Sequence, residues 1–355
     1  MVIASMLIGI YGKSGSLERA ENVFENINLR DVVIWTSLIS GYTEQGAGER
    51  ALICFETMQL EGLLPNIVTF VCCLKACGST GSPGVGEEIH AEILQKRLLA
   101  KNVELGNALV DMYAKCGRVD KAQEVFDKLF TRNVVTWNAL IAGYSQHGFG
   151  EEALRCFKEM RDQGFSPDKY TFSCALKACG IVRSLSMGEE IHVEVRKQEV
   201  LEKDPVLCTS LMDMYAKCGV LSKVQEVFDG LPVRSVILWN ILIAAYAQHE
   251  RGYEALNAYK CMCDEGFSPN AGTFSCILKV CGNIKSLEIG EGVHNEIRKV
   301  GLLERNCYIG TALVDMYAKC GLLEKSQEVF DKLPDHDVVT WNALISGYSQ
   351  QGCNA

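Results

Sequence analysis

Long hydrophobic runs, excess basic charge and proline are all scarce in this sequence. No apolar stretch approaches the ~18 residues that a helical membrane span needs, so no membrane partner is expected. The 35 Lys and Arg residues face 44 Asp and Glu, and the net charge of −9 argues against a nonspecific basic nucleic-acid binder. Only 7 prolines occur, and 48% of residues are hydrophobic, which is typical of a folded chain.

Motifs for catalysis or metal binding are also missing. The 17 cysteines include no Cys-x-x-Cys pair, and their spacing does not suit a zinc site. Three His-x-Glu sequences, beginning at His90, His192 and His294, match half of a zinc deaminase signature, but its Pro-Cys-x-x-Cys half is absent. We therefore expect structural roles for these histidines. The prediction is a non-catalytic chain with no metal, no cofactor and no small-molecule substrate.

What the sequence does contain is an internal period of 102 residues, which all four tryptophans follow at Trp35, Trp137, Trp239 and Trp341. Each period divides into repeats of 35, 36 and 31 residues, and together they form one array over residues 1–355. The predicted repeats are 1–31, 32–66, 67–102, 103–133, 134–168, 169–204, 205–235, 236–270, 271–306, 307–337 and a partial 338–355.

Each repeat is predicted to form two short amphipathic helices. In repeat 134–168, Trp137, Leu140, Ile141 and Tyr144 stand at i, i+3, i+4 and i+7, on one face of a first helix. A glycine follows as a left-handed cap, and a second apolar stripe comes after it. Such a pair cannot bury its apolar faces alone, whereas stacked neighbours can. The predicted fold class is all-α, an α-solenoid.

These repeats resemble pentatricopeptide repeats (PPR), in particular the PLS subclass with alternating P, L and S motifs. The strings VVTWNALIAGYSQHG, TFSCALKACG, NALVDMYAKCG and AQEVFDKL carry the resemblance, which extends over the whole chain. It implies a right-handed α-solenoid of helix–turn–helix repeats that binds single-stranded RNA in plant mitochondria or chloroplasts, about one base per repeat. Tetratricopeptide repeats, which bind peptides, have a different signature and a constant length.

The fifth residue of each repeat varies among small polar types on a nearly fixed scaffold: segments 107–117 and 311–321 differ only at their first residue. That pattern favours a sequence reader, although helix capping is an alternative, since Ser, Thr and Asn favour helix starts. In the family, the fifth residue reads a base together with the last residue of the same repeat. The implied base-reading pairs are Ser5/Asp31, Thr36/Asn66, Asn107/Asn133, Asn138/Asp168, Thr209/Ser235, Asn240/Asn270 and Thr311/Asp337.

The resemblance also implies an RNA site like 5′-GANYUNNYNG-3′, with N-terminal repeats at its 5′ end. Asp only accepts hydrogen bonds whereas Asn also donates, so exchanging the two can invert a preference between bases. The pair Thr209/Ser235 departs from the common combinations and leaves its base open. The pairs of the long repeats follow the simple code poorly: Val71/Asn102, Ser173/Asp204 and Ser275/Asn306.

Two further sets complete the expected interface. Apolar second residues resemble the family's wedge against the base, with packing between repeats as the alternative; they are Val33, Val135 and Ile237, and also Val2, Val68, Tyr170, Val206 and Val339. Glu104 and Gly272 do not suit this role. The expected phosphate contacts are Lys13, Lys115, Lys217 and Lys319, with Lys75, Lys177 and Lys279 nearby. These lysines predict a basic groove inside an acidic shell. The alternative is that they belong to an ordinary pattern of charged residues exposed to solvent.

Neither end carries the polar cap of a solenoid, and no Arg- and Ser-rich transit peptide precedes the array. The sequence therefore predicts a fragment of a longer organelle-targeted chain, without the C-terminal DYW deaminase domain of many such proteins. Its expected function is sequence-specific RNA binding that guides organellar RNA processing, for example C-to-U editing. Editing cofactors or a deaminase are the expected protein partners. A protein- or peptide-binding scaffold is the alternative.

Overall fold

The computed structural model describes residues 2–198, 204–303, 306–350 and 352, and within them every regular element is a helix. The prediction of an all-α fold is confirmed. The elements are α1 (Val2–Lys13), α2 (Leu17–Glu25), α3 (Val32–Glu44), α4 (Gly48–Leu60), α5 (Ile67–Thr80), α6 (Pro83–Gln95), η1 (Leu99–Lys101), α7 (Val103–Lys115), α8 (Val119–Lys128), α9 (Val134–Gln146), α10 (Gly150–Asp162), α11 (Lys169–Val182), α12 (Leu185–Lys197), α13 (Pro205–Lys217), α14 (Leu221–Asp229), α15 (Val236–Gln248), α16 (Gly252–Asp264), α17 (Ala271–Ile284), α18 (Leu287–Val300), α19 (Cys307–Lys319), α20 (Leu323–Asp331) and α21 (Val338–Gln350). None of these helices has both the length and the hydropathy for crossing a membrane.

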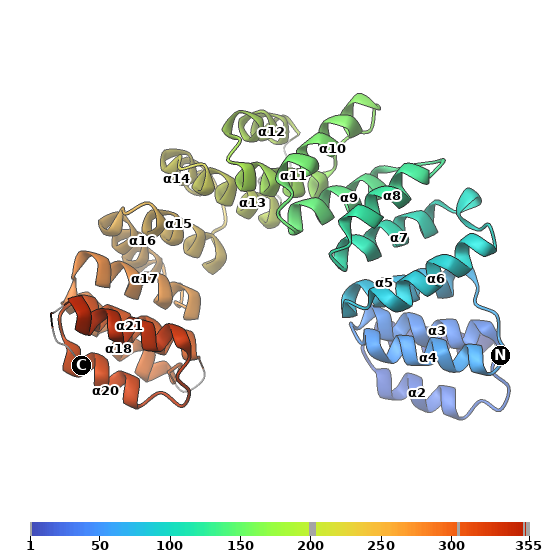
Figure 1. Ribbon diagram of the computed structural model, residues 1–355, viewed down its shortest axis with the longest axis horizontal. Coiled ribbons are helices and arrows are strands. Elements are labelled where there is room, and N and C mark those ends of the chain that lie inside the picture. The colour runs from blue at the N-terminus through green and yellow to red at the C-terminus, as the bar shows by residue number, and fades with distance from the viewer. Residues whose placement is uncertain (1, 199–203, 304–305, 351, 353–355) are drawn as a thin grey trace. The chain divides into compact units, whose positions relative to one another are not determined.

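The chain divides into two compact bodies, an N-terminal body of residues 1–182 and a C-terminal body of residues 183–355. In the N-terminal body, the first helices of successive repeats (α1, α3, α5, α7, α9 and α11) pack against one another in a row (Figure 1). Each second helix, such as α8, packs against the first helix of its own repeat and of the next. The C-terminal body has the same two layers, with α13, α15, α17, α19 and α21 in its row of first helices.

Local sequence sets where the helices begin and end. The first helices α9 and α15 begin at Val134 and Val236, the first residues of two predicted repeats. At the other end of α9, Gly148 has a φ of 84°, a left-handed conformation that side chains with a Cβ disfavour. The glycine therefore ends the first helix and reverses the chain into α10, as the sequence predicts.

The tryptophan period has a packing origin. Trp137 on α9 is fully buried and lies edge-to-face against Phe126 of α8, with ring centroids 4.6 Å apart. Such aromatic pairs add about 0.5–1.5 kcal/mol beyond the area they bury. The same contact recurs wherever a short repeat meets the next one, in the pairs Phe24–Trp35, Phe228–Trp239 and Phe330–Trp341. One aromatic contact per period fixes how these neighbouring repeats stack.

Several periodic cysteines also belong to the helix packing. Cys77 and Cys281 are fully buried at equivalent positions of α5 and α17, and burial raises the pKa of each thiol to about 12. The cysteines whose side chains the structure describes are free thiols. Cysteine in such surroundings behaves as a small apolar side chain, so these two positions have a structural role in the packing.

Candidate nucleic-acid interface

In most repeats the side chain of the last residue caps the first helix of the next repeat, Asn102 being an exception. Asn133 Oδ1 accepts the backbone N–H of Thr136 at 2.9 Å, and Thr136 Oγ1 accepts the backbone N–H of Asn133 at 3.1 Å. This reciprocal capping box satisfies two backbone donors that a helix start leaves unpaired. Asn66 and Asn270 make the same box. These first helices are therefore capped by last residues. Helix capping by the fifth residues, the alternative to base reading, was wrong.

The fifth residues lie one turn inside the first helix, and two predicted pairs are joined directly. Asn138 Nδ2 donates to both carboxylate oxygens of Asp168, at 3.1 and 3.0 Å. Asn240 Nδ2 donates to Asn270 Oδ1 at 3.1 Å. Because the last residue caps the next helix, packing of successive first helices brings the two members of these two pairs together. Fifth and last residues are 30 apart in sequence in both pairs.

Two fifth residues that carry a hydroxyl, Ser5 and Thr209, instead donate to their own helices. Ser5 Oγ donates to the carbonyl of Val2 at 3.0 Å, and Thr209 Oγ1 donates to the carbonyl of Val206 at 2.7 Å. Each hydroxyl has a single proton, so this bond leaves its lone pairs as the groups that another molecule can reach. Neither side chain is fully buried.

The predicted pair Thr209/Ser235 differs from the two joined pairs, because each of its hydroxyls is hydrogen-bonded within its own helix. Ser235 is the N-cap residue of α15, and its Oγ accepts the backbone N–H of Leu238 at 3.4 Å. Thr209 Oγ1 donates to the carbonyl of Val206, and the structure shows no hydrogen bond between the two hydroxyls. Serine is shorter than asparagine or aspartate, and its one oxygen is turned towards the start of its own helix. The structure thus gives Ser235 a capping role, and its base-reading role stays a prediction.

A threonine at the third position of the next repeat is a component that we did not predict. Thr136 Oγ1 donates to Asn107 Oδ1 at 2.5 Å, and the hydroxyls of Thr36 and Thr69 are 2.7 Å apart. We call the five residues of this kind the bridging threonines; they are Thr69, Thr136, Thr171, Thr273 and Thr340. The Asn-x-x-Thr or Asp-x-x-Thr spacing of the capping box could have signalled their position.

Two grooves in the N-terminal body bring these sets together. One has a volume of about 620 Å³ and is lined by Val71, Lys75, Glu104, Asn107, Ala108, Asp111, Val135, Asn138, Ala139, Asp168 and Tyr170. It holds three fifth residues (Val71, Asn107 and Asn138), one predicted last residue and two apolar second residues. The other groove, of about 300 Å³, is lined in part by Lys13, Val33, Thr36, Asn66 and Val68.

The apolar second residues are exposed, although such residues are commonly buried. The side chains of Val33, Val135 and Ile237 are 55%, 58% and 63% exposed. The alternative of ordinary packing between repeats is therefore wrong for these three. Tyr308, at the same position of its repeat, is 75% exposed and is a member of the set that the sequence analysis overlooked.

Three of the expected phosphate-contacting lysines form ion pairs. Lys115 Nζ lies 2.7 Å from Asp111, one turn earlier on α7, and the corresponding pairs on α13 and α19 have the same separation. We call Lys115, Lys217 and Lys319 the paired lysines, and Asp111, Asp213 and Asp315 the partner aspartates. The larger groove has a lining of mixed charge, because Glu104, Asp111 and Asp168 lie there together with Lys75. The expectation of a basic lining is therefore not met in this groove. Lys13 has Gly9 at the position of the partner aspartates.

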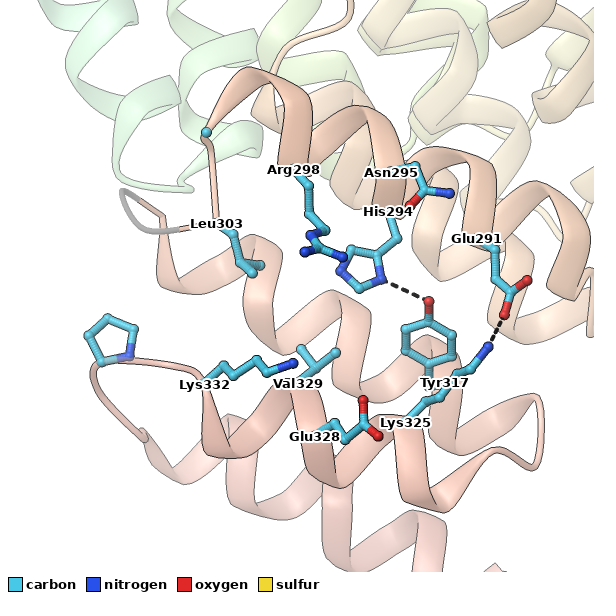
Figure 2. A pocket seen from close by; sticks show the side chains of 12 residues that line it. Glu291, His294, Asn295, Arg298, Leu303, Tyr317, Lys325, Glu328, Val329 and Lys332 are labelled. Atoms are coloured by element: carbon cyan, nitrogen blue, oxygen red, sulfur yellow. Dashed lines mark hydrogen bonds and ion pairs between the residues drawn. The ribbon is translucent and has the colours of Figure 1, made fainter.

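The His-x-Glu sequences contribute to packing between repeats. His294 Nδ1 on α18 is hydrogen-bonded to the hydroxyl of Tyr317 on α19 at 2.8 Å, beside a cavity of about 850 Å³ (Figure 2). Glu296 accepts a hydrogen bond from Tyr259 instead. The pairs His90–Tyr113 and His192–Tyr215 repeat the contact. No cluster of three or more His, Cys, Asp or Glu suited to a metal occurs among the residues that the structure describes.

This histidine contact makes stability depend on pH. His192 is 6% exposed, and burial, followed by the charges of Arg196 and Lys223, lowers its pKa from 6.5 to about 4. An unfolded chain takes up the proton near pH 6.5, whereas the folded protein resists it until about pH 4. Stability that is fully present above pH 6.5 is therefore lost as pH falls towards 4.

Between about pH 7.5 and about pH 5, we expect His192 to account for a loss of about 2 kcal/mol of unfolding free energy. Urea titrations at both pH values measure this loss. The substitution His192→Gln removes the titrating group, so the variant should lose correspondingly less than the wild type. An equal loss in both proteins would exclude this histidine as the cause.

Comparison with known proteins agrees with this architecture. The family model described as "PPR repeat family" matches residues 30–79, 132–180 and 234–283. The model described as "PPR repeat" matches residues 2–32, 107–134, 206–236, 311–338 and 339–354. The chain belongs to the pentatricopeptide repeat family.

Its curated relatives are longer plant proteins. Pentatricopeptide repeat-containing protein At4g18520, chloroplastic, of Arabidopsis thaliana is 36% identical over 352 residues, which cover 99% of this chain and 57% of that protein. The mitochondrial protein At3g09040 of the same plant is 35% identical over 344 residues, covering 97% of this chain and 33% of that protein. The chain thus spans between a third and somewhat more than half of these relatives.

Solved structures have the same fold. The pentatricopeptide repeat protein PPR10 in complex with an 18-nt psaJ RNA element matches with a TM-score of 0.79 and 19% identity, over 98% of this chain and 53% of that chain. A second structure, of PPR10 from maize, matches with a TM-score of 0.62 and 22% identity, over 99% of this chain and 57% of that chain. These likenesses show the helical-repeat fold.

Proposed function

We propose that this chain is a non-catalytic, sequence-specific binder of single-stranded RNA. The observation that carries the proposal is the larger groove of the N-terminal body, in which paired amide and carboxylate groups lie beside exposed apolar side chains. Amides and carboxylates can hydrogen-bond to base edges, while apolar and aromatic surfaces pack on base faces. A groove that offers both is suited to unstacked bases of a single strand.

The differences between pairs supply the selectivity. In the Asn138/Asp168 pair, the last residue is an acceptor only, which suits the protonated N3 of uracil. In the Asn240/Asn270 pair, Asn270 Oδ1 is engaged by Asn240 and by the backbone N–H of Thr273, so its NH₂ group is the donor that a base can meet. A donor suits the unprotonated N3 of cytosine. Together with the family resemblance, which leaves four of the ten bases open, this logic gives 5′-GANYUNNYNG-3′ as the proposed site.

The proposed setting is a plant organelle. Relatives named as chloroplastic and as mitochondrial support a mitochondrial or chloroplast location, and the RNA in the PPR10 complex supports the ligand class. The alternation of 35-, 36- and 31-residue repeats supports membership of the PLS subclass, and with it a role in C-to-U editing alongside editing cofactors or a deaminase. In that role the chain selects the transcript, and the chemistry belongs to another domain or protein.

Selection from a random pool of single-stranded RNA by the purified chain tests the proposal. We expect enrichment of sequences related to 5′-GANYUNNYNG-3′, with an affinity that falls as salt rises. Enrichment of an unrelated sequence would contradict the assigned pairs while leaving RNA binding intact. Binding without any RNA preference and without salt dependence would instead favour a protein- or peptide-binding scaffold.

A further inference from the structure

We infer that the bridging threonines are a third specificity-determining position, which acts by fixing the orientation of the fifth residue. The inference rests on the proposed function, because it concerns the same base-reading pairs. Its basis is that each bridging threonine lies within hydrogen-bonding distance of a fifth residue on the preceding first helix, at 2.5 to 2.7 Å. All five side chains are at most 1% exposed, so they act through the fifth residue and are positioning residues.

The geometry around Thr171 shows how the orientation is fixed. The backbone N–H of Asp168 donates to Thr171 Oγ1 at 3.1 Å, and Thr171 Oγ1 lies 2.5 Å from Asn138 Oδ1 and 2.9 Å from Asp168 Oδ1. A hydroxyl has one proton, and the shorter contact directs it to the amide oxygen of Asn138. That bond distinguishes the C=O end of the amide from its NH₂ end.

When a side-chain amide rotates by half a turn about its terminal bond, its NH₂ donor and its C=O acceptor exchange positions. A fifth-residue asparagine with a fixed amide therefore presents one pattern to a base, whereas one that turns freely presents two patterns and discriminates less. Asn138 is held at both ends, since its NH₂ group also donates to Asp168. Asn107 has the bridging hydroxyl of Thr136 on its oxygen, so this repeat should depend on the threonine most.

The other repeats provide a natural contrast. In the repeats after the first that have no bridging threonine, the equivalent side chain is apolar and buried; these residues are Ile34, Leu105, Leu207, Leu238 and Ile309. Three of them follow the long repeats, whose pairs fit the simple code poorly. The absence of the bridging hydroxyl supplies a physical reason why the pairs of the long repeats fit the code poorly. It also predicts strong selection at nucleotides 2, 4, 5, 8 and 10 of the ten-base site, and weaker selection at the other five.

The direct test removes the hydroxyl and keeps the shape. Thr136→Val should reduce the preference of the protein for C over U at nucleotide 4 by about tenfold, with a much smaller change in affinity for the preferred RNA. Thr136→Ser retains the hydroxyl and should restore the preference. Equilibrium titration of RNAs that differ only at nucleotide 4 gives the ratios, and thermal unfolding of each variant checks the fold.

The converse substitution adds the hydroxyl where it is missing. Ile34→Thr should strengthen the preference for G at nucleotide 1, where Ser5 and Asp31 form the pair, and five repeats already accept threonine at this position. If folded Thr136→Val keeps the wild-type ratio, or Ile34→Thr leaves nucleotide 1 unchanged, the positioning role is wrong. If the wild-type chain shows no base preference at all, it is the proposed function that fails.

Discussion

The double substitution Asn138→Thr with Asp168→Asn should change the preferred base at nucleotide 5 from U to A, and leave the other positions unchanged. The chain already contains the new combination in Thr36 and Asn66, with Thr69 bridging as Thr171 does here. The variant thus transfers an existing donor and acceptor set into repeat 134–168. Correct hydrogen bonding to a base edge is worth about 1–3 kcal/mol, so the U-to-A ratio should change by about 10- to 100-fold in each direction.

Asp168→Asn alone is the matched control, because it reproduces the pair Asn240/Asn270 and should favour C at the same nucleotide. Competition titrations with RNAs that carry each of the four bases at nucleotide 5 measure both variants. Equal weakening for all four bases would mean that the pair stabilises the fold or the groove without reading the base. A change at a nucleotide other than the fifth would show that the order of repeats along the RNA is misassigned.

Sequence periodicity was sufficient for those features that depend on contacts close in the chain. The helix pairs follow from the stripe that begins at Trp137, and the turn at Gly148 follows from the need for a positive φ. The meeting of Asn138 with Asp168 was anticipated from the family resemblance alone. Its physical reason, that Asp168 caps the next first helix beside Asn138, required the packed structure.

The bridging hydroxyl, the capping by Ser235 and the charge of the groove were missed for different reasons. Thr171 meets Asn138 from 33 residues away, and one sequence does not give the rotation of two neighbouring helices about their axes. Equal spacing along the chain likewise did not show that the short Ser235 side chain is turned to its own helix start. The partner aspartates were visible at i, i+4 spacing, but the lysines were counted without them. The size and mixed lining of the larger groove come from side chains of several helices and have no local signal.

The ion pairs of the short repeats lead to a prediction in which two sets of variants have opposite effects. Replacing all three paired lysines by glutamine should weaken RNA binding about tenfold at moderate salt, because three potential phosphate contacts are removed. The slope of log affinity against log salt should become shallower by about 2, since about 0.7 counterion is released per phosphate contact on a single strand. Preference among bases should stay the same.

Replacing the three partner aspartates by asparagine should instead strengthen RNA binding, because each paired lysine is released from an ion pair on its own helix. Asparagine has nearly the shape of aspartate, so the packing of α7, α13 and α19 is retained. If the lysines do not meet phosphate, the glutamine variant should bind like the wild type, and the asparagine variant should gain only from its less negative overall charge. Three Asp→Asn substitutions on the second helices, at Asp127, Asp162 and Asp229, change the net charge equally and separate the two effects.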